Sequence, residues 1–359
     1  MRVNSILPGD CVEELKKLPE NSIDLIFADP PYNMQLKNAL YRPDNTKVNG
    51  VDDTWDRFSS FAEYDEFCTA WLRECRRVLK DSGSIWVIGS YHNIFRVGNI
   101  MLNLGFWILN DVTWHKTNPM PNFLGKRFTN ATETLLWCAK GESYKKYIFN
   151  HKIMKRYNGG KQMTSVWRIG LCTGEERLKG ENGGKAHSTQ KPEELLKRVI
   201  LSTTKRGDIV LDPFFGTGTT GAVAKKLKRG YIGIEKEPEY IALAKNRIDG
   251  IKTFFPEADW EEEETGKRNR VPFEVLLRER LIQAGEQLYA RKTYNAAAFV
   301  LSNGKLEYKN QTGSIHKIGA LIQRTPSCNG WKFWYIMRGD KSVLIDELRN
   351  EYLQGKRGI

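Results

Sequence analysis

The chain has 359 residues, a formal net charge of +13 and 40% hydrophobic residues, which is enough apolar material for a buried core and excludes a wholly disordered protein. It is longer than one average domain, so we expect two domains. No run approaches the roughly 20 apolar residues of a membrane span, and the N-terminus lacks the apolar core of a signal peptide, so we expect a cytoplasmic protein.

Apolar runs and helical spacings alternate along the first 250 residues. We predict strands at residues 22–28, 84–89, 107–114, 133–139, 208–211 and 230–234, and helices at 64–79, 192–201, 219–227 and 238–248. Strands that alternate with helices predict an α/β fold, with a mostly parallel sheet covered by helices on both faces. Residues 34–57 are predicted to form a long loop, and residues 144–184 an irregular basic segment.

The last quarter of the chain has a different character. An acidic run at residues 261–264 predicts a solvated linker over residues 257–266. Beyond it, strands are predicted at residues 287–290, 297–301, 306–308 and 333–337, and a final helix at 343–352. Residues 267–359 contain 17 Lys and Arg against 8 Asp and Glu, a net charge of +9. This pattern predicts a small basic α+β domain with a polyanionic partner such as DNA.

The six cysteines and five histidines are scattered. No two cysteines form a C-x-x-C pair, and no two histidines form an H-x-x-x-H pair. The spacing therefore argues against a disulfide framework, and we expect reduced buried thiols and no metal site.

A glycine-rich turn connects a predicted strand to a predicted helix. It comprises Asp212, Pro213, Phe214, Phe215, Gly216, Thr217, Gly218, Thr219 and Thr220. Glycines let a ligand approach the backbone, and the helix N-terminus offers N–H groups to a carboxylate. Glu235 ends the next strand, where an acid accepts hydrogen bonds from ribose hydroxyls. A tight turn alone or a dinucleotide site would also fit, but the F-x-G-x-G form after Asp-Pro favours S-adenosylmethionine.

A second constellation, Asp29, Pro30, Pro31 and Tyr32, ends another predicted strand. An exocyclic amine of a nucleobase is a poor nucleophile because its lone pair is delocalised into the ring. A carboxylate at Asp29 and the carbonyl of Pro30 are able to accept both amino hydrogens, and the prolines fix the backbone. The ring of Tyr32 offers a stacking face for a base lifted out of the duplex.

Both constellations, in this order, resemble the β group of amino-methyltransferases, in which the catalytic motif precedes the cofactor motif. The segment His-Ser-Thr-Gln-Lys-Pro at residues 187–192 fits the same group, although Ser188 stands where proline is usual. Residues 42–45, 85–96, 118–122, 171–177 and 313–320 are similar to the cell-cycle-regulated adenine methyltransferases of alphaproteobacteria, which modify GANTC. This resemblance covers nearly the whole chain.

The resemblance implies further site residues. Asp10 and Cys11 would border the adenine of the cofactor, and Lys191 would lie beside its carboxylate. Candidates for contacts in the DNA grooves are Arg42, Asn45, Asn122, Lys126 and Arg127. A homodimer is also implied, since the group commonly dimerises.

The basic C-terminal stretch supplies its own candidates for DNA contact. Two predicted loops combine polar and aromatic residues: Ser314, His316, Lys317, Asn329 and Trp331. We expect Trp331 to be exposed because Asn329 and Lys332 flank it in a turn that contains glycine. Phe333 and one of the two tryptophans are expected in the core of this module.

These observations predict a Rossmann-like, circularly permuted methyltransferase domain over residues 1–256, including a target-recognition segment at about residues 115–186, followed by the linker and a DNA-binding domain over residues 267–359. The expected reaction is methylation of adenine N6 in double-stranded DNA from S-adenosylmethionine with base flipping, in the cytoplasm at the nucleoid. Cytosine-N4 methylation stays open, although those enzymes usually carry serine at the position of Asp29. A non-catalytic DNA-binding regulator on the same fold also stays open, as does, more remotely, a nicotinamide oxidoreductase.

Overall fold

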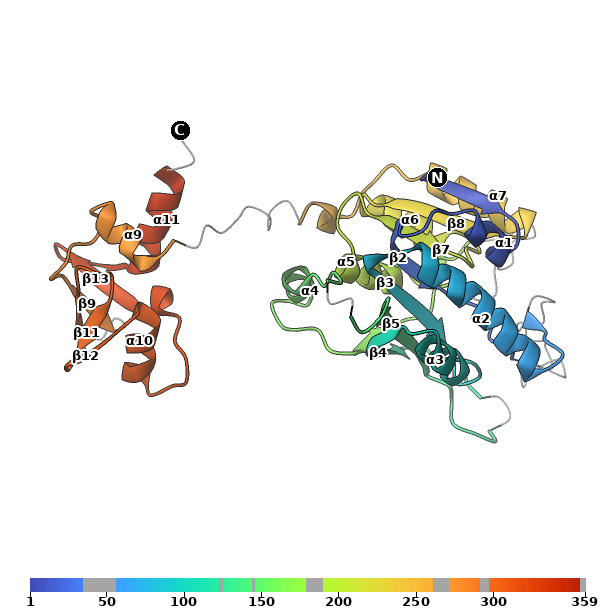
Figure 1. Ribbon diagram of the computed structural model, residues 1–359, viewed down its shortest axis with the longest axis horizontal. Coiled ribbons are helices and arrows are strands. Elements are labelled where there is room, and N and C mark those ends of the chain that lie inside the picture. Colours follow the sequence, from blue (N-terminus) through green and yellow to red (C-terminus); the bar gives the residue numbers. More distant parts are fainter. Residues whose placement is uncertain are drawn as a thin grey trace. The chain divides into compact units, whose positions relative to one another are not determined.

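The computed structural model describes residues 1–34, 56–122, 125–143, 146–178, 190–260, 271–290 and 297–355. The chain divides into two compact units, Met1–Thr265 and Gly266–Ile359 (Figure 1). Each unit has its own hydrophobic core, so each is described separately. Within the described residues, no helix is long and apolar enough to cross a bilayer.

The first unit is built on an eight-stranded sheet in the order β1-β8-β7-β2-β3-β5-β4-β6. All neighbouring pairs are parallel except the two made by β5, which runs antiparallel to both β3 and β4. The strands are β1 (Ser5–Pro8), β2 (Ile23–Ala28), β3 (Leu79–Gly89), β4 (Trp107–Lys116), β5 (Thr132–Ala139), β6 (Val166–Ile169), β7 (Ile209–Asp212) and β8 (Gly230–Glu235).

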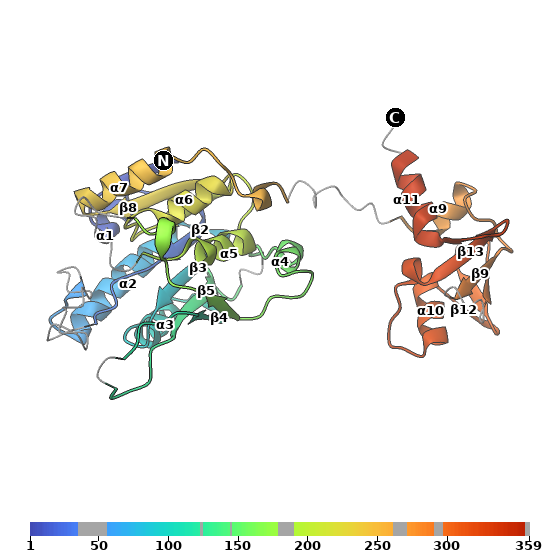
Figure 2. The same cartoon turned by 180° about the vertical axis from the view of Figure 1, so that it is seen from behind.

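Helices cover both faces of this sheet, which is why β2 is buried along its whole length. On one face lie α1 (Cys11–Lys16), α2 (Phe61–Val78) and α3 (Ile94–Asn103) (Figure 1). The other face carries α4 (His151–Tyr157), α5 (Glu193–Thr203), α6 (Thr219–Lys226) and α7 (Pro238–Asp249) (Figure 2).

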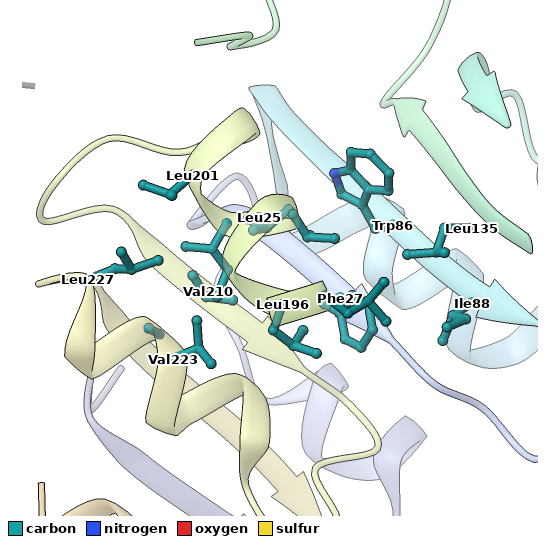
Figure 3. Packing of buried hydrophobic residues seen from close by; sticks show 14 of the residues in the cluster. Leu25, Phe27, Trp86, Ile88, Leu135, Leu196, Leu201, Val210, Val223 and Leu227 are labelled. Carbon is teal, nitrogen blue, oxygen red and sulfur yellow. The ribbon is translucent and has the colours of Figure 1, made fainter. Parts of the chain in front are cut away.

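The hydrophobic core beneath α5 and α6 explains why the most apolar segments form the central strands of the sheet. Figure 3 shows Leu25 and Phe27 of β2 and Val210 of β7 packed with Leu196 of α5 and Val223 of α6, all at most 1% exposed. Burying each such side chain contributes about 1.5–3 kcal/mol. This packing fixes the central strands whose carboxyl ends form the site described below.

The predicted α/β class is confirmed, and each predicted strand and helix of this unit has its counterpart in the structure, whereas α1 and α3 were not predicted. The prediction of a wholly irregular segment at residues 144–184 is wrong, because it contains α4 and β6. Helix α4 has only seven residues and is held by Ile153 and Met154 in the core. Strand β6 pairs with β4, far away in the sequence, so neither element has a strong local signal.

The second unit contains a six-stranded antiparallel sheet in the order β12-β11-β10-β9-β13-β14. Its strands are β9 (Gln287–Ala290), β10 (Ala297–Val300), β11 (Leu306–Tyr308), β12 (Gln311–Gly313), β13 (Trp334–Arg338) and β14 (Lys341–Leu344). The helices α9 (Phe273–Arg278), α10 (Ile315–Gln323) and α11 (Ile345–Gly355) complete it. Strands β9 and β11 have the predicted bounds, whereas α9, α10, β12 and β14 lacked a clear sequence signal.

Candidate active site

Four acidic residues follow or end four neighbouring parallel strands. Asp10 follows β1, Glu235 ends β8, Asp212 ends β7 and Asp29 follows β2. Pro8 pairs with Glu235, and the N–H of Gly9 donates to the carbonyl of Glu235 at 3.0 Å. The fold therefore brings the two sequence constellations to one edge of the sheet, the edge where open α/β sheets bind ligands.

The glycine turn after β7 has a backbone that side chains disfavour. Gly216 has φ +51° and Gly218 φ +75°, both in the left-handed region. A Cβ at Gly218 would also lie 2.8 Å from the Cβ of Ala244. The ring of Phe215 is buried and stacks on Tyr231, with ring centroids 6.1 Å apart. The turn is thus pressed against the sheet, and its glycines are required by geometry.

Carboxylates hold this turn in shape. Asp212 accepts from the N–H of Phe214 at 2.9 Å and from the hydroxyl of Thr220 at 2.6 Å. Burial raises the pKa of Asp212 to about 7. Glu235 accepts from the N–H of Gly216 at 2.7 Å through Oε2 and from that of Lys236 at 2.8 Å through Oε1. Burial also raises the pKa of Glu235.

These residues fit S-adenosylmethionine. Glycines at positions 216 and 218 let a ligand approach the main chain of the turn, and a part-buried carboxylate at Glu235 suits ribose hydroxyls. Asp10 is the N-cap of α1, accepting from the N–H of Val12 at 2.9 Å, and Cys11 is buried beside it. The predicted cofactor residues on β1, β7 and β8 are therefore neighbours.

The Asp-Pro-Pro-Tyr turn carries a buried charge network. Lys191 Nζ lies 2.6 Å from Asp29 Oδ2, although the sequence placed Lys191 beside the cofactor. The hydroxyl of Tyr32 lies 3.0 Å from Asp29 Oδ1 and 3.0 Å from Glu133 Oε2. Glu133 is in turn paired with Lys116, with Oε1 and Nζ 2.8 Å apart. Two cations thus balance two carboxylates around one phenol.

Burial and charge act in opposite directions within the network. Burial raises the pKa of Asp29, and Lys191 offsets part of that rise. Burial also acts to raise the pKa of Glu133, but Lys191 and Lys116 outweigh it and the pKa of this carboxyl is lowered. Burial together with Asp29 and Glu133 places the pKa of Tyr32 well above its ordinary value. The two lysines therefore favour an ionised Glu133, and Tyr32 stays a neutral hydrogen-bond donor.

Two side chains outside the motif fix its backbone. The hydroxyl of Tyr64 donates to the carbonyl of Pro31 at 2.8 Å. Asp56 accepts from the N–H groups of Asn33 at 2.7 Å and of Met34 at 3.0 Å. These bonds hold the chain on both sides of Tyr32, so the phenol has a defined position.

Sequence reasoning missed Lys116, Glu133, Asp56 and Tyr64. The one usable signal was Glu133, an acid near the start of β5, a strand whose other residues are all uncharged. The others have ordinary local contexts, and only the fold brings them to the motif.

The predicted DNA-contacting residues of the first unit lie on its surface or outside the described residues. Arg42 and Asn45 lie outside the described residues. Lys126 and Arg127 are exposed, and Arg127 Nη1 donates to the hydroxyl of Tyr91 at 2.5 Å. Asn122 is half-buried, and its carbonyl accepts from the N–H of Gly125 at 3.1 Å.

In the second unit, three of the predicted residues order a turn. Ser314 caps α10 by accepting from the N–H of Lys317 at 3.2 Å. His316 Nδ1 lies 3.0 Å from the N–H of Gly330 and 3.2 Å from the carbonyl oxygen of Cys328. Asn329 and the side of α10 that carries Lys317 remain exposed.

The expected exposure of Trp331 is wrong. This side chain is 8% exposed, packs edge-on against Phe273 at 6.0 Å between ring centroids, and has Arg349 4.6 Å from its ring. The His316–Gly330 bond pins the turn against α10, so the next residue enters the core. Phe333 and Trp334 are buried as well, so both tryptophans are core residues.

The Rossmann-like sheet, the glycine turn with its strand-end acid and the neighbouring Asp29 motif define an S-adenosylmethionine-dependent methyltransferase. The family model described as DNA methylase, for N6 and N4 methyltransferases, matches residues 23–246, and the chain belongs to this family. A second model, Restriction Enzyme Adenine Methylase Associated, matches residues 257–358.

Individual relatives agree with this assignment. The chain is 52% identical over 350 residues to Type II methyltransferase M.HinfI of Haemophilus influenzae, covering 98% of this chain and 97% of the relative. It is 46% identical over 253 residues to Type II methyltransferase M2.LlaDCHI of Lactococcus lactis subsp. cremoris, covering 70% and 91%.

Solved structures carry the same fold. The complex of M1.HpyAVI with S-adenosylmethionine matches with a TM-score of 0.50 and 28% identity, covering 68% of this chain and 98% of that one. The cytosine-N4-specific PvuII DNA methyltransferase matches with a TM-score of 0.54 and 24% identity, covering 73% and 91%. At that identity the PvuII enzyme supports the fold alone.

Proposed function

We propose that this DNA methyltransferase transfers a methyl group to N6 of adenine in double-stranded DNA at a specific site. The observation that carries the proposal is the Asp29 carboxylate at the end of β2, oriented by Lys191 and Tyr32. Two names support it: the 52% identical relative is a Type II methyltransferase, and the second matching model is described as adenine-methylase-associated.

The chemistry follows from the geometry of Asp29. Its Oδ1 accepts an amino hydrogen of the target base, which draws the nitrogen towards tetrahedral geometry, and its charge stabilises the positive charge that develops there. Lys191 holds Oδ2 and so fixes the plane of the carboxylate. S-adenosylmethionine supplies an activated methyl group on a positively charged sulfur. The protein's main task is to hold the amine at near-attack distance from that methyl group, about 3 Å.

The cofactor would lie along the carboxyl ends of β1, β8 and β7. Glu235 would accept the ribose hydroxyls, Asp10 and Cys11 would border the adenine, and the glycine turn would face the amino-acid end. On the sequence resemblance, Lys191 would also lie beside the cofactor carboxylate.

Tyr32 would stack on the flipped base while its hydroxyl stays bonded within the charge network. A duplex with 2-aminopurine at the target position tests this role. The fluorescence should rise on binding. Tyr32→Ala should weaken the binding of the flipped base by about 1–3 kcal/mol. Unchanged fluorescence with the wild type would refute extrusion.

Cytosine-N4 methylation is the second candidate. The same scaffold serves the PvuII enzyme, and both target amines are exocyclic. Asp29 favours adenine, because the cytosine-N4 enzymes usually carry serine at that position.

For the target we propose GANTC, on the sequence resemblance, with the basic second unit adding DNA affinity and the enzyme acting as a homodimer. Tritiated S-adenosylmethionine with two duplexes tests the site, one carrying a single GANTC and one with the same bases rearranged. Label should enter only the first. Equal labelling of both would refute the specificity, and sedimentation in the presence of DNA would report the dimer.

A further inference from the structure

The hydroxyl of Tyr32 stands between two carboxylates at equal distances. It lies 3.0 Å from Asp29 Oδ1 and 3.0 Å from Glu133 Oε2. A phenol has one proton, so it donates to only one of these oxygens at a time. The other carboxylate oxygen does not receive that proton in that state and is able to accept from another donor.

The target amine and Tyr32 approach the same oxygen of Asp29. Lys191 holds Oδ2 at 2.6 Å, so we expect the amine to approach Oδ1, which Tyr32 shares. A carboxylate oxygen has two lone pairs, but a donor that it already binds lowers the negative charge that it offers to the next one. Moving the Tyr32 bond to a second acceptor therefore makes Oδ1 a stronger acceptor for the amine, and it keeps the buried hydroxyl paired, since an unpaired hydroxyl costs about 1–3 kcal/mol.

Glu133 has the position and the partners of such a second acceptor. It projects from the central strand β5, and its side chain is 11% exposed. Its Oε1 is 2.8 Å from Nζ of Lys116 on β4, a side chain that is also 11% exposed. Lys116 lies over the ring of Trp114, 5.4 Å from its centroid. The pair is therefore fixed by two adjacent strands, and Oε2 is left pointing at Tyr32.

We propose that Glu133 is a positioning residue that takes the Tyr32 hydroxyl bond when Asp29 turns to the target amine. The inference rests on the proposed transfer to an exocyclic amine and applies equally to adenine N6 and cytosine N4. No covalent bond changes in this step: one hydrogen bond moves from Asp29 to Glu133, and the amine takes the vacated oxygen. Lys116 holds Glu133 in place throughout.

A double-mutant cycle of Tyr32→Phe and Glu133→Gln tests the proposal. Single-turnover methyl transfer on a GANTC duplex is measured for the wild type, both single variants and the double variant, with dissociation constants for cofactor and DNA determined separately. Glu133→Gln should slow transfer by about tenfold or more when Tyr32 is present and by less than about threefold in the Tyr32→Phe background. Both dissociation constants should stay within about twofold of the wild type.

Glu133→Gln leaves Lys116 buried without its carboxylate, which destabilises the fold. A second double-mutant cycle therefore controls for misfolding. It combines Tyr32→Phe with the pair Glu133→Gln and Lys116→Met, which removes both charges, and circular dichroism checks each protein. The same dependence on Tyr32 is expected. Equal slowing in both backgrounds, or an effect confined to binding constants, would overturn the role of Glu133. A wild type that transfers no label would instead refute the proposed function.

Discussion

Lys191 Nζ lies 2.6 Å from Asp29 Oδ2, and both side chains are largely buried, at 8% and 18% exposure. The two residues are 162 positions apart in the sequence. Lys191 comes just before α5, and Asp29 follows β2, so the ion pair exists only because α5 packs across the central strands. It joins the segment predicted to serve the cofactor to the segment predicted to serve the base.

The pH dependence of the reaction should report this ion pair. Burial raises the pKa of Asp29, and Lys191 lowers it, so Lys191→Met should raise it further. Protonation of Asp29 removes the negative charge that stabilises the positive charge developing on the amino nitrogen, so the acid limb of the single-turnover rate profile should move to higher pH. Lys197→Met, which removes a lysine paired with Glu257 further along α5, is the control and should leave that limb unchanged. If the acid limb of Lys191→Met stays where it is in the wild type, Lys191 does not control the ionisation of Asp29.

Asp212 should make stability depend on pH. Its folded pKa of about 7 lies above the ordinary value of 3.8 because the carboxyl is buried. The stabilisation is therefore complete below the ordinary pKa and is lost as pH rises through about 7. The free energy of unfolding should fall less between about pH 5 and about pH 8 in Asp212→Asn than in the wild type. Denaturant titrations at several pH values measure it, and equal slopes would contradict the raised pKa.

Glu235 should govern cofactor affinity. Glu235→Ala removes the carboxyl that we propose as the acceptor for the ribose hydroxyls and also the bond to the N–H of Gly216. The loss should be about 1.5–3 kcal/mol, or roughly tenfold to 100-fold in the dissociation constant for S-adenosylmethionine. Calorimetry measures it, with the exposed Glu237→Ala as control and DNA binding expected to stay unchanged. Wild-type affinity in Glu235→Ala would place the ribose contact elsewhere.

Much of this site could be predicted from local sequence. The buried strand β2 ends in a motif whose chemistry is contained in four consecutive residues, and the turn at Gly216 and Gly218 requires glycine by its own backbone angles. Neither inference needs knowledge of distant parts of the chain.

Lys116 could not be found in this way, and Glu133 stood out only as an acid within a predicted strand. Glu133 contacts Tyr32 from β5, and Lys116 contacts Glu133 from β4. These strands join the sheet out of sequence order, so the roles of both residues depend on distances that only the fold sets. The prediction that Trp331 is exposed was wrong for a related reason. Its polar neighbours suggested exposure, but the contact between His316 and Gly330 turns it inward.

The burial of Trp331 leads to a stability prediction. Trp331→Ala should remove about 3–5 kcal/mol from the unfolding free energy of the second unit, because it empties a core position beside Phe273. Denaturant unfolding followed by circular dichroism measures the loss, and the neighbouring exposed Lys332→Ala should change it by less than about 0.5 kcal/mol. A Trp331→Ala protein with unchanged stability and lost DNA binding would return Trp331 to the DNA interface.

Identification of the methylated nucleoside tests the central claim most directly. A GANTC duplex incubated with the protein and labelled S-adenosylmethionine is digested to nucleosides, and the label is assigned by chromatography against standards. We predict N6-methyladenine as the labelled product, and a loss of at least about 100-fold in Asp29→Ala while that variant still binds the cofactor. Label in N4-methylcytosine, or Asp29→Ala that keeps more than about a tenth of the wild-type rate, would contradict adenine-N6 transfer through Asp29.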